Sequence, residues 1–174
     1  MRFDERTEPL LEELAQKILV CTKCKLSETR AHAVPGEGPQ HARLMMVGEA
    51  PGANEDEQGR PFVGQAGQLL DELLAKSGIK REDTFITSVI KCRPPDNRNP
   101  TEEEVITCVP YTLAQLDSIC PSVIVIMGNI AYEIFAETFY LPKKPIGDVR
   151  GKAFRLHSTG AKILVPTYHP AGLM

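Results

Sequence analysis

The chain has 174 residues, of which 42% are hydrophobic, and its 20 basic and 23 acidic residues give a formal net charge of −3. That length favours one domain with its own core, and that charge excludes a strong overall attraction to nucleic acid. The sequence contains no apolar run of the roughly 18 residues that a membrane span needs. Its charged start is unlike a secretory signal peptide. We therefore expect a cytoplasmic protein with no membrane partner.

Apolar residues recur at two spacings along the chain. Leu11, Leu14 and Ile18 follow the spacing of a helix, whereas other stretches are continuously apolar, as buried strands are. Thr101 and Glu104 have the spacing of a capping box, which predicts the start of a helix. In chain order the pattern predicts a helix over 10–21, a strand over 42–48, a helix over 64–78, a strand over 84–92, a helix over 101–118, a strand over 122–128, a helix over 129–139 and a strand over 162–167.

The alternation of predicted strands and helices indicates the fold class. Continuously apolar strands between helices are typical of a parallel sheet that is covered on both faces. We predict a three-layer α/β/α fold with a central four-stranded, mainly parallel sheet, in one domain over 1–174. A short hairpin within 147–157 is also expected.

Polar residues follow three of the predicted strands. Glu49 comes after the first strand, Ser88 lies near the end of the second, and His169 follows the fourth. In open α/β sheets, ligands bind outside the carboxyl ends of the strands. The topology therefore predicts one crevice that holds a carboxylate, a hydroxyl and an imidazole.

Four of the five cysteines have a spacing that suits metal binding. Cys21 and Cys24 form a CxxC pair, and the stretch between Cys92 and Cys108 is stiffened by three prolines. Four thiolates suit zinc or an iron–sulfur cluster. Because the second CxxC knuckle of a zinc ribbon is missing, a cluster wrapped by a loop fits better. The alternative is one CxxC pair plus two buried thiols, and Cys120 is expected in the core.

The stretch GEAPGANEDEQGRPFVG, residues 48–64, combines glycines with acids. A glycine-rich turn after a strand suggests a phosphate cradle, but carboxylates repel phosphate. Glu49 follows a buried strand directly, where a carboxylate suits positioning a water or stabilising a developing positive charge. A surface loop with solvated acids is the alternative, and it suits Asp56 and Glu57. Phe62 is either core or a stacking platform for a planar ligand.

Several stretches together resemble one known family. GEAPGANEDEQGRPFVGQAGQLLDELL, VIKCRPPDNRNPT and PTYHP, with the four cysteines, are similar to the family 4 uracil-DNA glycosylases, the iron–sulfur enzymes of their superfamily. The resemblance runs from about Cys21 to the end of the chain. It implies hydrolysis of the N-glycosidic bond of uracil in single- or double-stranded DNA, in base excision repair. It also implies a [4Fe–4S] cluster, in a loop region around 92–108, with the ligands Cys21, Cys24, Cys92 and Cys108.

The resemblance assigns roles to the residues of the predicted crevice. Glu49 matches the catalytic glutamate, and His169 matches the histidine that donates a hydrogen bond to the uracil carbonyl. Phe62 matches the aromatic residue that stacks on the flipped base. The full set of residues expected to bind uracil is Glu49, Ala50, Pro51, Glu55, Phe62, Ser88 and His169.

The DNA also has to be held during this reaction, and phosphate contacts supply that binding. The segment from residue 141 to the end carries six basic residues and one acid. The segment 143–162 and Lys91 offer phosphate contacts, although ordinary solubility is the alternative for any one lysine. Leu173 matches an apolar wedge that fills the gap left by the flipped base, with simple packing as the alternative. The predicted DNA-binding residues are Arg93, Arg98, Lys143, Lys144 and Leu173.

Two features depart from the family, and three alternatives stand beside it. Ser88 replaces an asparagine that reads the uracil edge, so one rotatable hydroxyl stands in for an amide with a donor and an acceptor. The chain stops at Met174, where the family usually continues with the rest of the wedge loop and a final helix. The alternatives are a non-catalytic or covalently trapping uracil-DNA binder, which the histidine-free loop 93–101 disfavours, a redox or electron-transfer iron–sulfur protein, and a zinc-stabilised interaction module. We expect a monomer, and the sequence names no repair or clamp partner.

Overall fold

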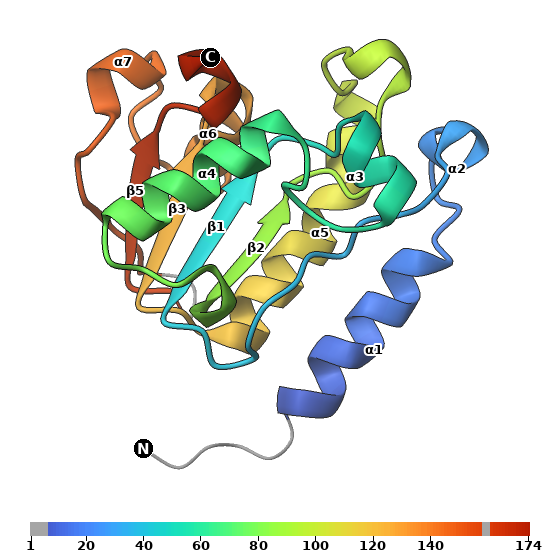
Figure 1. Ribbon diagram of the computed structural model, residues 1–174, viewed down its shortest axis with the longest axis horizontal. Coiled ribbons are helices and arrows are strands. Elements are labelled where there is room, and N and C mark those ends of the chain that lie inside the picture. Colours follow the sequence, from blue (N-terminus) through green and yellow to red (C-terminus); the bar gives the residue numbers. More distant parts are fainter. Residues whose placement is uncertain (1–6, 158–160) are drawn as a thin grey trace.

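The computed structural model describes residues 7–157 and 161–174, and within those ranges one five-stranded sheet forms the centre of the fold (Figure 1). The strands lie in the order β2-β1-β3-β5-β4, and every neighbouring pair is parallel except β4 and β5. Their bounds are β1 (Leu44–Gly48), β2 (Thr84–Ser88), β3 (Val123–Met127), β4 (Phe154–Arg155) and β5 (Ile163–Thr167).

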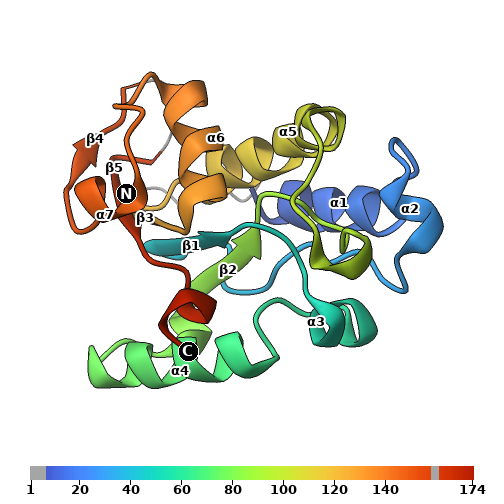
Figure 2. The ribbon, with the colours of Figure 1, turned by 90° about the horizontal axis from the view of Figure 1, so that it is seen from above.

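Helices cover both faces of this sheet. Figure 2 shows α4 on one face and α1, α5 and α6 on the other. The α-helices are α1 (Thr7–Leu19), α2 (Leu26–Thr29), α3 (Ala53–Gln58), α4 (Gln65–Lys76), α5 (Glu102–Ile119), α6 (Asn129–Phe139) and α7 (Ile146–Val149). Three short 3₁₀ helices complete the described elements: η1 (Arg81–Asp83), η2 (Pro95–Asn97) and η3 (Pro170–Leu173).

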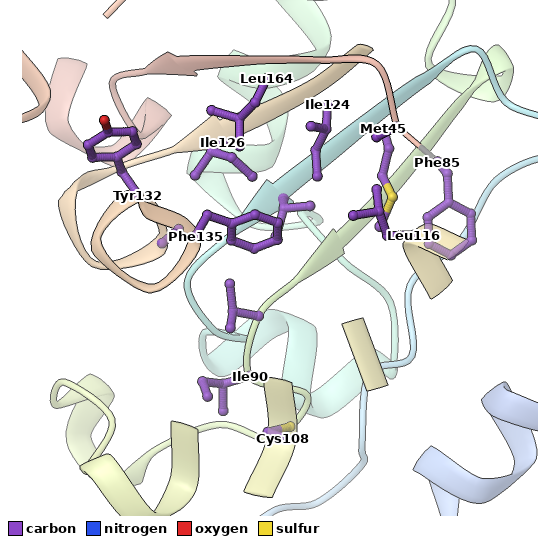
Figure 3. Packing of buried hydrophobic residues seen from close by; sticks show 14 of the residues in the cluster. Met45, Phe85, Ile90, Cys108, Leu116, Ile124, Ile126, Tyr132, Phe135 and Leu164 are labelled. Carbon is purple, nitrogen blue, oxygen red and sulfur yellow. The ribbon is translucent and has the colours of Figure 1, made fainter. Parts of the chain in front are cut away.

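Two apolar clusters fill the space between the layers. Because successive side chains of a strand point to opposite faces, Met45 joins the larger cluster and Met46 the smaller one. Figure 3 shows the larger cluster, in which Phe135 of α6 and Leu116 of α5 pack with the sheet residues. The smaller cluster lies under α4: Met46, Phe62, Leu70, Leu74, Ile86 and Met127. Burial on both faces explains why the strands are apolar without alternation.

The predicted fold class is confirmed, but the predicted number of strands is wrong. The four predicted strands form and run parallel, and the short strand β4 is added at the edge, antiparallel to β5. The prediction of a hairpin within 147–157 is wrong: residues 146–149 form α7, and β4 pairs with β5, which begins at Ile163. The second strand was expected to reach residue 92, but it ends at Ser88.

The helix α5 begins at the predicted capping box. The Thr101 side chain accepts a hydrogen bond from the Glu104 amide, and the Glu104 carboxylate accepts one from the Thr101 amide. The prediction that Cys120 is core is wrong: Cys120 caps the end of α5 with a positive φ of 51° and is exposed. None of the helices in the described ranges has the length and apolar character needed to cross a membrane.

Candidate active site

A cavity of about 340 Å³ lies at the carboxyl ends of β1, β2 and β5. Glu49 follows β1, Ser88 ends β2, and His169 comes two residues after β5, so the parallel strands deliver all three to one edge. The crevice predicted from the topology is therefore present. All seven residues expected to bind uracil line it: Glu49, Ala50, Pro51, Glu55, Phe62, Ser88 and His169.

Glu49 is held by its backbone, and its side chain is left free. Its carbonyl accepts a hydrogen bond from the Ile90 amide at 2.9 Å, which continues the pairing beyond β2. Its carboxylate makes no hydrogen bond or ion pair with any residue that the structure describes. Burial raises the pKa of this carboxyl group above its ordinary value of 4.5. The cavity thus contains a half-buried acceptor that is available to a water or a ligand.

His169 is held in one tautomer by the backbone that follows it. The Ala171 amide donates a hydrogen bond to His169 Nδ1 at 3.1 Å. A nitrogen that accepts carries no proton, so the proton of the neutral ring is assigned to Nε2. Burial lowers the pKa of His169 below 6.5, against the opposing charge of Glu55. At neutral pH the ring is therefore an uncharged donor through Nε2.

Phe62 is both core and cavity wall. Its side chain is buried with Met46 and Ile86 in the smaller apolar cluster. It also lines the cavity, where its ring centroid lies 5.5 Å from that of His169 at an interplanar angle of 32°. The two interpretations of Phe62 from the sequence, a core residue and a ring available for stacking, are therefore compatible.

The other acids of the 48–64 stretch differ from one another in burial. Glu57 is exposed, as predicted, but the prediction that Asp56 is solvated is wrong. The Asp56 Oδ1 accepts hydrogen bonds from the Ala31 amide at 2.9 Å and the His32 amide at 3.3 Å. It ties α3 to a segment about twenty-five residues earlier, a pairing that no local sequence pattern indicates.

Lys91 is buried, so the prediction that it contacts phosphate is wrong. Its Nζ donates to Thr87 Oγ1 and the Ser88 carbonyl at 2.7 Å each, and to Gln115 Oε1 at 2.8 Å. Burial lowers the pKa of Lys91 to about 7, against the opposing charge of Cys108. Lys91 thus holds the carboxyl end of β2 without lining the cavity.

The residues expected to bind DNA lie at the surface. Arg98 lines the cavity and makes a bidentate ion pair with Glu104 at 2.7 and 2.9 Å, which holds the pKa of Glu104 below 4.5. Arg93 Nε donates to Asn97 Oδ1 at 2.8 Å. The other three are exposed: Lys143 and Lys144 between α6 and α7, and Leu173 in η3.

A second cavity is lined by Cys21, Cys24, Cys92 and Cys108, which come from the end of α1, the segment after β2 and α5. Two nitrogens donate to these sulfurs: Arg30 Nη1 to Cys92 Sγ at 3.1 Å, and the Lys91 amide to Cys108 Sγ at 3.2 Å. Burial raises the pKa of the Cys92 thiol, and that of the Cys108 thiol to about 11.

In the described ranges, no three His, Cys, Asp or Glu side chains are arranged to hold a single metal ion. The buried thiols ionise only with difficulty, and a bound metal group is what makes such cysteines thiolates.

Comparison with known proteins decides the family. Residues 35–174 match the model of the uracil DNA glycosylase superfamily. Type-4 uracil-DNA glycosylases of Saccharolobus solfataricus and Thermotoga maritima are each 46% identical to the chain, over 94% and 96% of its length and 77% and 84% of theirs. The chain belongs to the type-4 uracil-DNA glycosylases. A type-5 uracil-DNA glycosylase of Thermus thermophilus is 33% identical, over 80% of this chain and 69% of the relative.

Membership of the type-4 uracil-DNA glycosylases confirms the resemblance drawn from the sequence. Three residues near the cavities were given no role by sequence reasoning: Arg30 beside Cys92, Gln115 beside Lys91, and Arg81 behind Phe62. Each acts through a partner at least 19 positions away in the chain, so the sequence carried no spacing signal for it.

Proposed function

We propose that this protein hydrolyses the N-glycosidic bond of uracil in DNA, releasing uracil and leaving an abasic site for base excision repair. One observation carries the proposal. A free carboxylate and an uncharged imidazole donor line one cavity of about 340 Å³ in a chain 46% identical to type-4 uracil-DNA glycosylases. A carboxylate and a hydrogen-bond donor are the two groups that this hydrolysis needs.

The base has to leave the DNA stack before it can reach Glu49 or His169. Flipping a nucleotide costs a few kcal/mol. Stacking of a base on an aromatic ring returns about 1–3 kcal/mol. Phe62 offers such a ring at the wall of the cavity, so it offsets part of the cost of extrusion.

The leaving group develops negative charge as the bond between C1′ and the base nitrogen breaks. The electron pair of that bond goes to the uracil ring. The Nε2–H of His169 is a donor for the uracil carbonyl oxygen, and a donor of this kind is worth about 3 kcal/mol in related oxyanion sites. Since Nδ1 accepts from the Ala171 amide, the proton stays on Nε2 and the orientation is kept.

The sugar develops positive charge in the same step, as in glycoside hydrolysis. The Glu49 carboxylate stabilises that charge and orients the attacking water. The water oxygen bonds to C1′, and its proton passes to Glu49. A carboxyl whose pKa is raised by burial is a better proton acceptor than an ordinary glutamate.

We also propose that Cys21, Cys24, Cys92 and Cys108 hold a [4Fe–4S] cluster. Four cysteines that line one small cavity, with N–H donors to two of the sulfurs, are a ligand set that suits such a cluster, and the relatives of this chain are type-4 enzymes. When bound, the cluster would cross-link the end of α1, the segment after β2 and α5. Its role in the proposal is to hold the fold and not to transfer electrons during turnover.

DNA contact is proposed for four basic residues and one leucine at the surface of the protein. Arg98, on the cavity wall, and Arg93, Lys143 and Lys144 are the phosphate contacts in this proposal. Leu173 is 55% exposed in η3, close to α4, and is the proposed wedge.

A cleavage assay tests the proposal. Anaerobically purified protein is mixed with labelled oligonucleotides that carry U opposite G, U opposite A, single-stranded U, or T as a control, and abasic sites are cut by alkali. We expect product from each uracil substrate and none from T. No product from protein with a full iron content would contradict the proposal and favour a uracil-DNA binder or a redox protein. One zinc with no iron would favour the interaction module.

A further inference from the structure

Phe62 has a backbone conformation that bulky residues rarely adopt. Its φ is 49°, in the left-handed region, where side chains without a special reason are strained. Such conformations persist only where the surroundings fix them, and they cluster at functional sites. The residues that fix Phe62 are therefore of interest for the site that its ring lines.

Arg81 of η1 fixes the turn from the side away from the cavity. Its Nη1 donates to the Phe62 carbonyl at 2.9 Å and its Nη2 to the Pro61 carbonyl at 2.6 Å. The guanidinium is itself held by Asp71 at 2.7 Å and Glu37 at 3.4 Å, and the Arg81 side chain is only 20% exposed. A planar group with five donors can make all four contacts at once, whereas an ammonium group cannot.

Glu55 fixes the same turn from the cavity side. Its Oε1 accepts from the Val63 and Gly64 amides at 3.0 Å each. The two carbonyls of residues 61–62 and the two amides of residues 63–64 are therefore each held by a charged side chain.

Two glycines make room for this turn. A Cβ at Gly67 would lie 1.9 Å from the Phe62 carbonyl oxygen, and a Cβ at Gly48 would lie 2.6 Å from Phe62 Cζ. Gly48 ends β1, so the ring packs directly against the strand that delivers Glu49. Two charged side chains and two glycines thus fix the position of the Phe62 ring beside His169.

We infer that Arg81 is a positioning residue for base recognition, which acts through the Phe62 ring and rests on the proposed function. Within the described residues Arg81 does not line the cavity and touches no catalytic group. By holding the carbonyls of residues 61 and 62, it keeps Phe62 in the conformation that presents its ring to a flipped base.

A double-mutant cycle tests the inference. Arg81→Met is expected to lower kcat/KM on uracil-DNA about tenfold, the worth of a well-placed stacking ring. In a Phe62→Ala background the same change is expected to cost less than about twofold, because the group through which Arg81 acts is gone. An equal loss in both backgrounds would overturn the inference. Arg60→Met is the matched control, since Arg60 shares Glu37 with Arg81 but is 56% exposed.

A second measurement does not depend on activity. Hydrogen exchange of the Val63 and Gly64 amides is expected to quicken in Arg81→Met and to stay at the parent rate in Arg60→Met. Amides of β3 report any global loss of stability in the same sample. Unchanged exchange at Val63 and Gly64 would overturn the inference. If the parent protein fails to cleave uracil-DNA, the proposed function fails, while the exchange rates still decide the role of Arg81 in fixing the turn.

Discussion

The cavity lined by Glu49 and His169, the proposed catalytic cavity, and the cavity lined by the four cysteines, the cysteine cavity, both take residues from the end of β2 onward. Ser88 lines the catalytic cavity, and Lys91 and Cys92 line the cysteine cavity. In the catalytic cavity, the Glu49 carboxylate has no partner among the described residues, and the His169 ring accepts one hydrogen bond from them, through Nδ1. In the cysteine cavity, two of the four sulfurs already accept hydrogen bonds from nitrogens.

We therefore expect substitutions in the catalytic cavity to affect activity and substitutions in the cysteine cavity to affect stability. Free, half-buried groups are unfavourable for the fold and useful to a substrate, so their removal should abolish activity without unfolding the protein. The four cysteines come from distant segments of the chain, so their removal should lower the stability of the fold.

After Glu49, the largest expected effect comes from His169 in the catalytic cavity. His169→Gln should lower kcat about a hundredfold or more, because the donor to the departing uracil is lost. Melting temperature and iron content should stay near those of the parent. His41→Gln, an exposed histidine before β1, is the control. A loss of iron in His169→Gln would show that the two cavities are not separate.

Cys108 is the matching test in the cysteine cavity. Cys108→Ala should abolish iron binding and lower the melting temperature by about 10 °C or more, since metal-binding energy at such sites is folding energy. Iron analysis and thermal unfolding measure this directly. Cys120→Ala, at an exposed cap, should change neither. Full iron content in Cys108→Ala would contradict the proposed ligand set.

The pH dependence of single-turnover cleavage sharpens the role of Glu49. The carboxyl must be ionised to act, and burial raises its pKa above 4.5, so activity should begin to fall at a higher pH than for an ordinary glutamate. Below that pKa the rate should drop about tenfold per pH unit. Because burial lowers the pKa of His169, no break is expected at 6.5 or above. A break there that persists in Lys91→Met, which removes a lysine with a pKa of about 7, would show that a charged imidazole takes part.

Lys91 lies between the cavities and should affect stability more than DNA binding. Lys91→Met removes the donor to Thr87 Oγ1 and Gln115 Oε1, while the Ser88 carbonyl keeps a hydrogen bond from Thr112 Oγ1, and we expect a cost of about 2 kcal/mol in the free energy of unfolding. Denaturant unfolding measures the change, with the exposed Lys80→Met as control. An unchanged free energy would contradict the structural role of Lys91.

Substitution of Arg98 should have the smallest effect, and it should change the salt dependence of DNA binding. If Arg98 contacts a phosphate, Arg98→Gln should reduce the slope of log binding constant against log salt by about 1. Lys91→Met should leave that slope unchanged, because Lys91 is buried. Binding measured over a range of salt concentrations distinguishes the two, and an unchanged slope in Arg98→Gln would remove Arg98 from the proposed DNA contacts.

The sequence was sufficient where local pattern and topology decide the structure. Buried strands have continuous apolar runs, and their carboxyl ends meet at one edge, so Glu49, Ser88 and His169 were correctly expected to lie together. The capping box fixed the start of α5 because its two partners are three residues apart. The four cysteines whose spacing suggested metal binding likewise line one cavity.

Hydrogen bonds between distant segments could not be predicted from the sequence. Asp56 and Lys91 look like solvated charges until the partners that desolvate them are known: the amides of residues 31–32 in one case, Gln115 in the other. Cys120 looks like core because cysteine is often buried, but its place at a helix cap turns it outward. Strand β4 has two residues, too few for any period to show.

Single-turnover release of uracil from a U·G duplex by the parent, Glu49→Gln and Glu57→Gln tests the central claim most directly. Glu49→Gln should lose about a thousandfold in rate, and it should melt no lower than the parent at pH 7, because a buried charge has been removed. Glu57→Gln, an exposed acid of the same stretch, should match the parent. A Glu49→Gln rate within about tenfold of the parent would contradict the assignment of the chemistry to this cavity.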